Sequence, residues 1–283
     1  MTSSSRALLC RGRLLDYTHR TLIMGVLNVT PDSFSDGGAL HDPAAAVAAG
    51  RRMLSEGAHI LDIGGESTRP GADPVEEREE IRRVVPVIET LADVTEATIS
   101  VDTYKPAVAE AALAAGAHMV NDITGLADAD MADVATRNGA AVAIMHMQGS
   151  PRTMQDSPTY DDVVTDIAAF LQERANFARE RGVDARSIMV DPGIGFGKTA
   201  LGHNLDILRR LDELAGLGWP LLVGPSRKSF IGAILDDAPP GDRLEGTAAA
   251  VAIAITGGAH AVRVHDVREM SRVARVADAI RYA

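Results

Sequence analysis

The sequence predicts an α/β protein, a single (β/α)8 TIM barrel with an N-terminal extension or hairpin. Eight short apolar runs rich in Val, Ile and Leu recur along the 283 residues, and a longer segment with helical spacing follows each run. Continuous apolar strands that alternate with helices are typical of a parallel sheet covered on both faces. Eight such units close most economically into a barrel. A doubly wound open sheet is the alternative, but the glycine-rich first turn and the domain boundary usual in that fold are not found.

The expected elements follow these runs in chain order. Strands are expected at residues 21–28, 59–65, 98–103, 118–123, 141–146, 187–193, 220–227 and 261–267. Helices are expected at residues 42–57, 74–92, 105–116, 129–139, 165–182, 203–218, 245–258 and 268–282. Several of them end in glycine, where a left-handed cap costs least, at Gly57, Gly116, Gly139, Gly182 and Gly257. Residues 1–20 then form a tail or hairpin, and residues 21–283 form the barrel domain.

Two connections are longer than a barrel needs. They run over residues 29–42 and 147–160, about 14 residues each, and exceed the usual strand-to-helix connection. Loops of this length commonly act as lids over a site. Surface decoration is the alternative for the second.

Composition excludes several classes of partner. The formal charge is −11 and the pI is near 5.2, which argues against nucleic-acid backbones and anionic membranes as partners. The single cysteine, Cys10, excludes an intramolecular disulfide and fits a reducing compartment, and we expect an inert thiol in a loose terminus. No run approaches about 18 unbroken apolar residues, and no secretory segment is found. We therefore expect a cytoplasmic protein that does not enter a membrane.

The stretch DPGIGFGKT, residues 191–199, resembles a phosphate-binding loop. The Walker pattern needs four residues between its first glycine and Gly-Lys, and the position it requires is occupied by Pro192. Counting from Gly193 leaves one residue too few, so a nucleotide triphosphatase is disfavoured. The glycines need another explanation, and Lys198 is interpreted as a solvated loop lysine.

Polar side chains follow every expected strand, and barrel chemistry is located at those ends. The positions are Asn28, Asp62, Asp102, Asn121, Asp122, His146, Asp191, Arg227, Lys228, Arg263 and His265. An isolated Asp after a strand is usually a helix N-cap, and this interpretation is strong for Asp122 and Asp266. It explains Asp102 and Asp191 less well.

The remaining polar residues divide by chemistry. Asp102, Asn121 and Asp191 can accept hydrogen bonds from a planar heterocycle that carries ring N–H and amino donors. The cations and donors suit a phosphate or diphosphate, and they are Thr68, Arg69, Lys228, Arg263 and His265. One half of the site is expected to read a heterocycle and the other half to hold an anion.

Other chemistries are disfavoured. His59, His118 and His146 are separated by whole strand-helix units and lack a metal-ligand spacing, so we expect histidines satisfied by their own neighbours. Ser67 and Ser226 lack the Gly-x-Ser-x-Gly context of a nucleophilic hydrolase.

At this point the sequence resembles a known family. The segments GVLNVTPDSFSDGG, DIGGESTRPGA, SVDT, NDI, MHMQGSP, DPGIGFGKT, GPSRKSFIG and RVHDV are similar, in this order and over about residues 22–282, to dihydropteroate synthase. The resemblance implies a transferase with a pterin-binding (β/α)8 catalytic domain. It would join 6-hydroxymethyl-7,8-dihydropterin diphosphate to 4-aminobenzoate in folate biosynthesis, release diphosphate and be a target of sulfonamides.

The resemblance also implies roles for residues. The pterin would be bound by Asp102, Asn121, Asp191, Lys228 and Arg263. The diphosphate would be bound by Asn28, Thr68, Arg69, Arg263 and His265, with Mg²⁺ held through Asn28. The aminobenzoate would contact Phe34, Thr68, Pro70, Phe196, Lys228 and Ser229, and the residues assigned to catalysis are Asp102, Asp191, Lys228, Arg263 and His265.

The family further implies a homodimer and long mobile loops after the first and second strands. These loops, around Phe34 with Asp36 and around Arg69 with Pro70, would close as lids. An SN1-like reaction is expected, since breaking the bond to diphosphate is the difficult step. Two alternatives stay open, a pterin-binding paralogue without turnover and a pterin-dependent methyltransferase.

Overall fold

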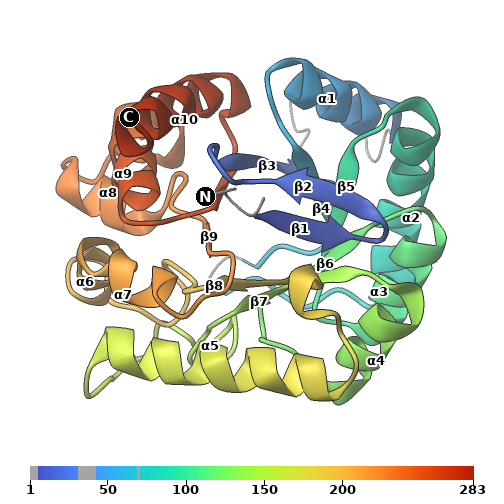
Figure 1. Ribbon diagram of the computed structural model, residues 1–283, viewed down its shortest axis with the longest axis horizontal. Coiled ribbons are helices and arrows are strands. Elements are labelled where there is room, and N and C mark those ends of the chain that lie inside the picture. The colour runs from blue at the N-terminus through green and yellow to red at the C-terminus, as the bar shows by residue number, and fades with distance from the viewer. Residues whose placement is uncertain (1–5, 31–42, 69–70) are drawn as a thin grey trace, which may run out of the picture.

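A computed structural model describes residues 6–30, 43–68 and 71–283 of the protein (Figure 1). Eight parallel strands form one sheet in the order β8-β7-β6-β5-β4-β3-β10-β9. They are β3 (Leu22–Asn28), β4 (Ile60–Gly64), β5 (Thr98–Asp102), β6 (Met119–Asp122), β7 (Ala141–Met145), β8 (Ile188–Asp191), β9 (Leu222–Val223) and β10 (Ala261–Val264). A parallel bridge between Val190 and Leu221 links the two ends of this order. The predicted barrel is confirmed, and each expected run contains one strand.

Helices surround the sheet (Figure 1). They are α1 (Pro43–Ser55), α2 (Glu77–Val94), α3 (Pro106–Ala114), α4 (Ala129–Asn138), α5 (Val163–Glu180), α6 (His203–Arg209), α7 (Leu211–Ala215), α8 (Ser229–Ile234), α9 (Leu244–Thr256) and α10 (Val267–Arg281). Short 3₁₀ turns lie at Ala185–Ser187 and Pro240–Asp242. No helix of the described residues is long and apolar enough to cross a membrane.

The helices differ from expectation at three places. The single helix expected at 203–218 is interrupted at Arg210, whose guanidinium pairs with Asp162 and Glu213. Helix α8 was not expected. Gly257 is wrong as a left-handed cap, since its φ is −76° and Gly258 takes the left-handed conformation with φ +111°.

Side-chain alternation along the strands creates two apolar layers and one polar layer. In β5, Ile99 and Val101 pack outward with the helices, whereas Ser100 and Asp102 point into the barrel. On most strands the inner positions near the start are apolar, for example Leu22, Ile60 and Met119, and those near the end are polar. The barrel therefore has a polar cup at its carboxyl end.

An N-terminal hairpin closes the opposite mouth. Strands β1 (Ala7–Cys10) and β2 (Arg13–Asp16) pair in antiparallel fashion and lie against the sheet (Figure 1). Leu8 and Cys10 are fully buried in a cluster with strand-start residues such as Leu22. Cys10 is thus not in a loose terminus, because burial fixes it there, and this burial raises the pKa of its thiol to about 12. The expectation of an inert thiol agrees with that shift.

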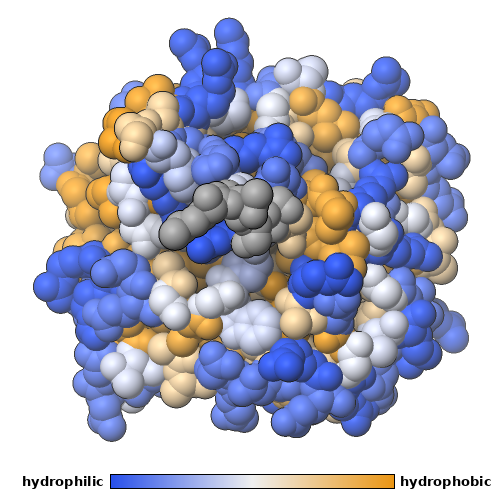
Figure 2. All heavy atoms as spheres, viewed as in Figure 1, coloured by the Kyte–Doolittle hydropathy of each residue, from blue (hydrophilic) through white to orange (hydrophobic). Residues whose placement is uncertain are grey.

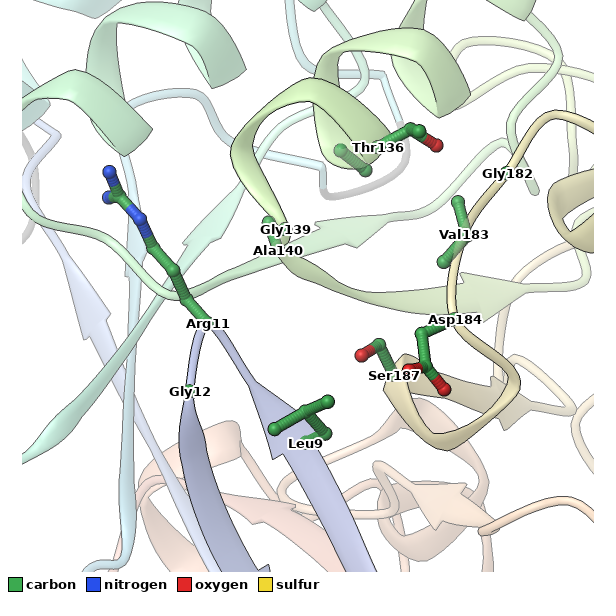
Figure 3. Close-up of a pocket in the computed structure, with 11 residues that line it drawn as sticks. Leu9, Arg11, Gly12, Thr136, Gly139, Ala140, Gly182, Val183, Asp184 and Ser187 are labelled. Atoms are coloured by element: carbon green, nitrogen blue, oxygen red, sulfur yellow. The ribbon is translucent and has the colours of Figure 1, made fainter.

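A cavity of about 340 Å³ lies beside the hairpin turn (Figure 3). The hairpin places it at the end of the barrel opposite the polar cup. Its lining includes Leu9, Arg11, Thr136, Val183, Asp184 and Ser187. Arg11 points away from Asp184 in Figure 3 and donates to the carbonyls of Leu113 and Ala117. The cavity holds none of the residues predicted for the site.

Candidate active site

The polar cup is built from inward positions on neighbouring strands. The parallel register places Asn28, Gly64, Asp102 and Asn121 in one row across β3 to β6. Asp62 on β4 lies two residues before Gly64 and shares its inward direction. Strand pairing alone therefore brings together side chains that are far apart in the sequence.

Arg263 on β10 joins the cup across its centre. Its Nε donates to Asp62 Oδ2 at 2.6 Å, and its Nη2 donates to Asp102 Oδ2 at 2.6 Å. Asn121 Nδ2 also donates to Asp62 Oδ2, at 3.0 Å. Both carboxylates are buried, so these charge-assisted bonds form where water competes little. Asp62 had no role assigned from the sequence, although it was noted as a strand-end residue.

The same carboxylates keep free acceptor capacity. Asp62 Oδ1 and Asp102 Oδ1 are buried and have no hydrogen-bond partner within the described parts of the chain. A buried acceptor without a donor costs free energy, which a ligand donor can recover. Burial raises the pKa of Asp102, and Arg263 opposes that shift. These oxygens can accept N–H groups from a bound heterocycle.

Asp191 and Lys228 complete the inner wall. Asp191 Oδ1 accepts the Gly193 N–H at 2.7 Å, and burial raises the pKa of Asp191 to about 6. Burial and the nearby Arg263 lower the pKa of Lys228 to about 8. Lys228 Nζ lies 4.0 Å from the centre of the Phe196 ring, a cation–π contact. The structure thus brings together the five residues expected around the pterin.

His265 enters from the end of β10. Its Nδ1 lies 3.0 Å from Ser226 Oγ, which also accepts the His265 backbone N–H at 3.2 Å. Burial and Arg263 lower the pKa of His265 to about 3, so the ring is neutral near pH 7. Because Ser226 faces Nδ1, the ring can offer its Nε2–H to an anion as a neutral donor. Within the group of cations and donors predicted from the sequence, His265 is therefore a neutral donor.

Asn28, Thr68 and Ser229 are placed less centrally. A Cβ on Gly64 would lie 3.6 Å from both Asn28 Oδ1 and Asp102 Oδ2, so the glycine keeps open the space between these oxygens. Thr68 is half-buried at the last described position before 69–70, and Ser229 is the exposed first residue of α8. Phe34, Asp36, Arg69 and Pro70 lie outside the described residues.

The residues fit a Mg²⁺ ion shared with a substrate. Amide and carboxylate oxygens suit this cation, which usually keeps waters and substrate phosphates as further ligands. Asn28 Oδ1 is such a donor at the rim of the cup. The described ranges contain no group of three or more His, Cys, Asp or Glu side chains that could hold a metal alone.

Two histidines and two aspartates noted in the sequence make contacts with their own surroundings. His59 and His118 each accept a backbone N–H, from Ile23 at 2.9 Å and Ile99 at 3.2 Å, and they are satisfied histidines as expected. Asp122 caps its own loop through Thr124 and Leu126, not helix α4, whose N-cap is Asp128. Asp266 holds the N-cap position of α10, but its side chain makes no capping bond and pairs with Arg227.

The expectation of a solvated Lys198 is wrong. Lys198 is 2% exposed, and its Nζ binds the Phe196 carbonyl at 2.8 Å and His146 Nδ1 at 3.0 Å. Glycine is required at position 193 because the backbones pack closely there: a Cβ on Gly193 would lie 2.0 Å from the His146 carbonyl oxygen. The loop after β8 is therefore folded against the end of β7.

The connection 147–160 supports that loop. Gln148 spans it, donating from Nε2 to the Thr159 carbonyl at 2.8 Å and accepting the Thr159 N–H at 3.0 Å. Gln155 and Tyr160 donate to the carbonyls of Gly195 and Gly197, each at 2.7 Å. In this structure the segment braces the 193–197 loop, and it does not stand apart from it as a free lid.

A second buried lysine was missed from the sequence. Lys105 Nζ binds Glu66 Oε2 at 2.5 Å, Glu80 Oε2 at 2.6 Å and the Val75 carbonyl at 2.6 Å. Glu66 also accepts the Val75 N–H at 2.8 Å and the Tyr104 hydroxyl at 2.7 Å. This clamp ties together both ends of the connection that follows β4. The only available signal was a lysine beside Pro106 at a strand end.

Known proteins match this chain in sequence and in fold. The family model described as pterin binding enzyme matches residues 24–265. The chain belongs to the dihydropteroate synthase family. It is 48% identical over 268 residues to the dihydropteroate synthase of a Synechocystis species, covering 94% of this chain and 92% of the relative.

Solved structures agree with that membership. The Yersinia pestis dihydropteroate synthase in complex with a sulfonamide drug has a TM-score of 0.92 and 46% identity, covering 98% of this chain and 100% of the other. The Xanthomonas albilineans dihydropteroate synthase with 4-aminobenzoic acid also has a TM-score of 0.92, with 45% identity over 99% and 100% of the two chains. The protein is therefore a transferase, as members of the dihydropteroate synthase family are.

Proposed function

We propose that the protein joins 6-hydroxymethyl-7,8-dihydropterin diphosphate to 4-aminobenzoate and releases 7,8-dihydropteroate and diphosphate. The observation that carries the proposal is the pair of buried, unpartnered oxygens of Asp62 and Asp102 beside Arg263. A pterin carries a row of ring N–H and amino donors that these oxygens and Asp191 can accept. Membership of the dihydropteroate synthase family supports this choice of heterocycle.

The pterin binds in the cup. Asp102, Asn121 and Asp191 read its polar edge, Lys228 donates to its carbonyl side, and the Arg263 guanidinium stacks on its face. Arg263 is prepared for this role because the carboxylates of Asp62 and Asp102 already fix its guanidinium. The residues that hold the ligand are thus positioned before the ligand arrives.

The diphosphate lies toward the rim. Its proposed contacts are Asn28, Thr68, Arg263 and the neutral His265 ring. Arg69 is a further proposed contact that lies outside the described residues. Asn28 Oδ1 would hold a Mg²⁺ ion, which when bound would supply positive charge against the negative charge of the leaving diphosphate. The rim is open enough for this because Gly64 contributes no side chain there.

The reaction is SN1-like. The C–O bond breaks first and its electron pair leaves with the diphosphate, while Arg263 and His265 donate to the departing oxygens. The carboxylates of Asp102 and Asp191 stabilise the pterin cation that remains. The aniline nitrogen then forms the C–N bond and loses its proton to water. No general base is needed before the attack, since the aniline is neutral.

The aminobenzoate completes the site. Its proposed contacts within the described part of the chain are Thr68, Phe196, Lys228 and Ser229. The other proposed contacts, Phe34 and Pro70, lie outside that part. Sulfonamides bind in the same place, and the drug complex of the Yersinia pestis relative supports this proposal.

We also propose a cytoplasmic homodimer. Apolar side chains are exposed on neighbouring helices, with Leu205 of α6 36%, Ile253 of α9 52%, Val276 of α10 63% and Ile280 of α10 68% exposed. Figure 2 shows apolar residues gathered on the side where α8 and α9 lie. An exposed patch of this kind commonly marks an interface. Sedimentation of the protein and of an Ile280→Glu variant tests it, with a monomeric variant expected.

The decisive experiment follows diphosphate release and dihydropteroate formation together, with and without 4-aminobenzoate. Coupled formation of both products, lost when EDTA removes Mg²⁺, supports the synthase. Pterin binding without release would favour the silent paralogue. Methyl transfer from a methylated pterin would favour the methyltransferase, which has no use for His265 and the other diphosphate donors.

A further inference from the structure

Lys198 is an unusual cation in this chain. Only three lysines occur in the sequence, Lys105, Lys198 and Lys228, against 25 arginines. Lys198 is the one among them that forms no ion pair and no cation–π contact within the described residues, although it is almost fully buried. A buried ammonium without a carboxylate partner is costly, so neutral groups must satisfy its donors.

Three neutral acceptors surround it. Nζ lies 2.8 Å from the Phe196 carbonyl, 3.0 Å from His146 Nδ1 and 3.3 Å from the His146 carbonyl. Burial lowers the pKa of His146 to about 3, so its ring is neutral and can accept through Nδ1. The three N–H donors of one ammonium thus match three acceptors, which join the end of β7 to the loop after β8.

The bond to Phe196 is one of three that fix this loop. Gly195 O accepts from Gln155, Phe196 O accepts from Lys198, and Gly197 O accepts from Tyr160. Three successive carbonyls of the loop are therefore each held by a side chain from outside the cup. The Phe196 side chain is left to face Lys228 Nζ, 4.0 Å from its ring centre.

Lys198 also balances the buried charge. The cup holds three carboxylates, those of Asp62, Asp102 and Asp191, and its cations Arg263 and Lys228 offset two of them. Lys198 adds a third positive charge from behind the loop, close enough to Asp191 for the two charges to interact. Burial lowers the pKa of Lys198 to about 7, whereas the charge of Asp191 favours the ammonium form.

We propose that Lys198 is a positioning residue for the second substrate, which acts by holding the Phe196 carbonyl and so setting the orientation of the Phe196 ring beside Lys228. This rests on the proposed function, in which Phe196 forms a wall for 4-aminobenzoate. A ring displaced by the loss of this bond weakens aminobenzoate binding more than pterin binding. Positioning errors of about 1 Å can cost up to about 100-fold.

The test compares steady-state kinetics of Lys198→Met with wild type. We expect the KM for 4-aminobenzoate to rise about tenfold, while kcat and the KM for the pterin diphosphate change by less than about threefold, the signature of lost ground-state binding. In a double-mutant cycle, Lys198→Met added to Phe196→Leu should raise this KM by less than about threefold. Lys198→Arg keeps the charge and some donors, and we expect an intermediate KM.

Arg11→Met is the matched control, because Arg11 is a cation bound to two backbone carbonyls at the opposite mouth. We expect lower stability and unchanged KM values for it. Equal rises in both KM values, or additive effects with Phe196→Leu, overturn the inference. If Lys198→Met is not recovered folded, a wild-type KM in Lys198→Arg overturns it, and a raised aminobenzoate KM alone supports it. Dihydropteroate formation by the wild-type protein is measured first. Its absence would overturn the proposed function itself.

Discussion

Arg263 and Asp62, 201 residues apart in the sequence, form an ion pair with 2.6 Å between Nε and Oδ2, and the carboxylate of this pair is fully buried. The pair joins β10 to β4 across β3 and aims the guanidinium over the cup. The same Asp62 oxygen accepts from Asn121. One carboxylate thus orients two residues proposed to bind the pterin, without any need to touch the ligand through that oxygen.

Asp62→Asn should therefore lower kcat/KM for the pterin diphosphate about 100-fold, roughly 3 kcal/mol of transition-state stabilisation. The amide keeps the shape but removes the charge that holds Arg263. Asp133→Asn breaks the half-exposed pair with Arg181 and serves as control, with activity unchanged. Equal activity in both variants would contradict the role of Asp62.

Asp102→Asn should reduce turnover more than diphosphate binding. The carboxylate is proposed to stabilise the pterin cation, whereas the diphosphate is held at the rim. We expect kcat to fall by a factor of about 100 to 1,000, with the Kd of diphosphate within about threefold of wild type. Steady-state assays measure kcat and calorimetry measures the Kd of diphosphate. Equal losses in both would contradict the role assigned to Asp102.

Activity should decline on the acid side of neutrality because of Asp191. Its pKa is raised by burial to about 6, so the carboxylate gains a proton as the pH falls through that value and loses an acceptor for the pterin. The pH profile of kcat/KM for the pterin diphosphate should show an acid limb near pH 6. Asp191→Asn should lose this limb along with most activity. An unchanged limb in that variant would assign it to another group.

Gly193→Ala should disturb the loop after β8. The added Cβ would lie 2.0 Å from the His146 carbonyl oxygen, at a residue with φ +68°. Gly139→Ala is the control, since Gly139 has φ +60° and nothing within 4 Å of the added Cβ. Denaturant titration should show a loss of about 1 kcal/mol for the control and at least twice that for Gly193→Ala. Similar losses of stability in the two variants would mean that the cost of the change at Gly193 comes from backbone strain and not from the close approach of His146.

Lys105→Met should destabilise the fold through the clamp behind β4. The change leaves Glu66 and Glu80 without their cation, and breaking a buried pair costs about 3 to 5 kcal/mol. Burial already raises the pKa of Glu80, so its carboxylate can be neutralised as the pH falls. The loss of stability should thus be smaller at pH 5 than at pH 8.

Glu110→Gln is the control for this variant, because it breaks the exposed pair with Arg137. The expected cost is about 0 to 1 kcal/mol at either pH. A loss for Lys105→Met that is as small as this, or that does not vary with pH, would contradict the clamp.

Local patterns were sufficient to predict the barrel and most of the proposed site. The alternation of apolar runs and helical segments depends on nearest neighbours, and the carboxyl ends of parallel strands always meet at one edge. Asp102, Asn121, Asp191 and Arg263 could therefore be placed together from their positions after strands. Asp62 occupies the same kind of position, but nothing local indicates that it pairs with Arg263.

Tertiary packing decided the rest. Lys198 stands in a glycine-rich loop, where a lysine is usually solvated, and only the close approach of the end of β7 buries it against neutral acceptors. The left-handed conformation is adopted by Gly258, not by Gly257, at a position where a Cβ would lie 2.6 Å from the Ala215 side chain. The sequence thus carried the periodicity of the fold and the chemistry of its strand ends. The three-dimensional arrangement decides which side chains pair with each other in the cup and its loops, because the free energy of a buried charge depends on every group that surrounds it.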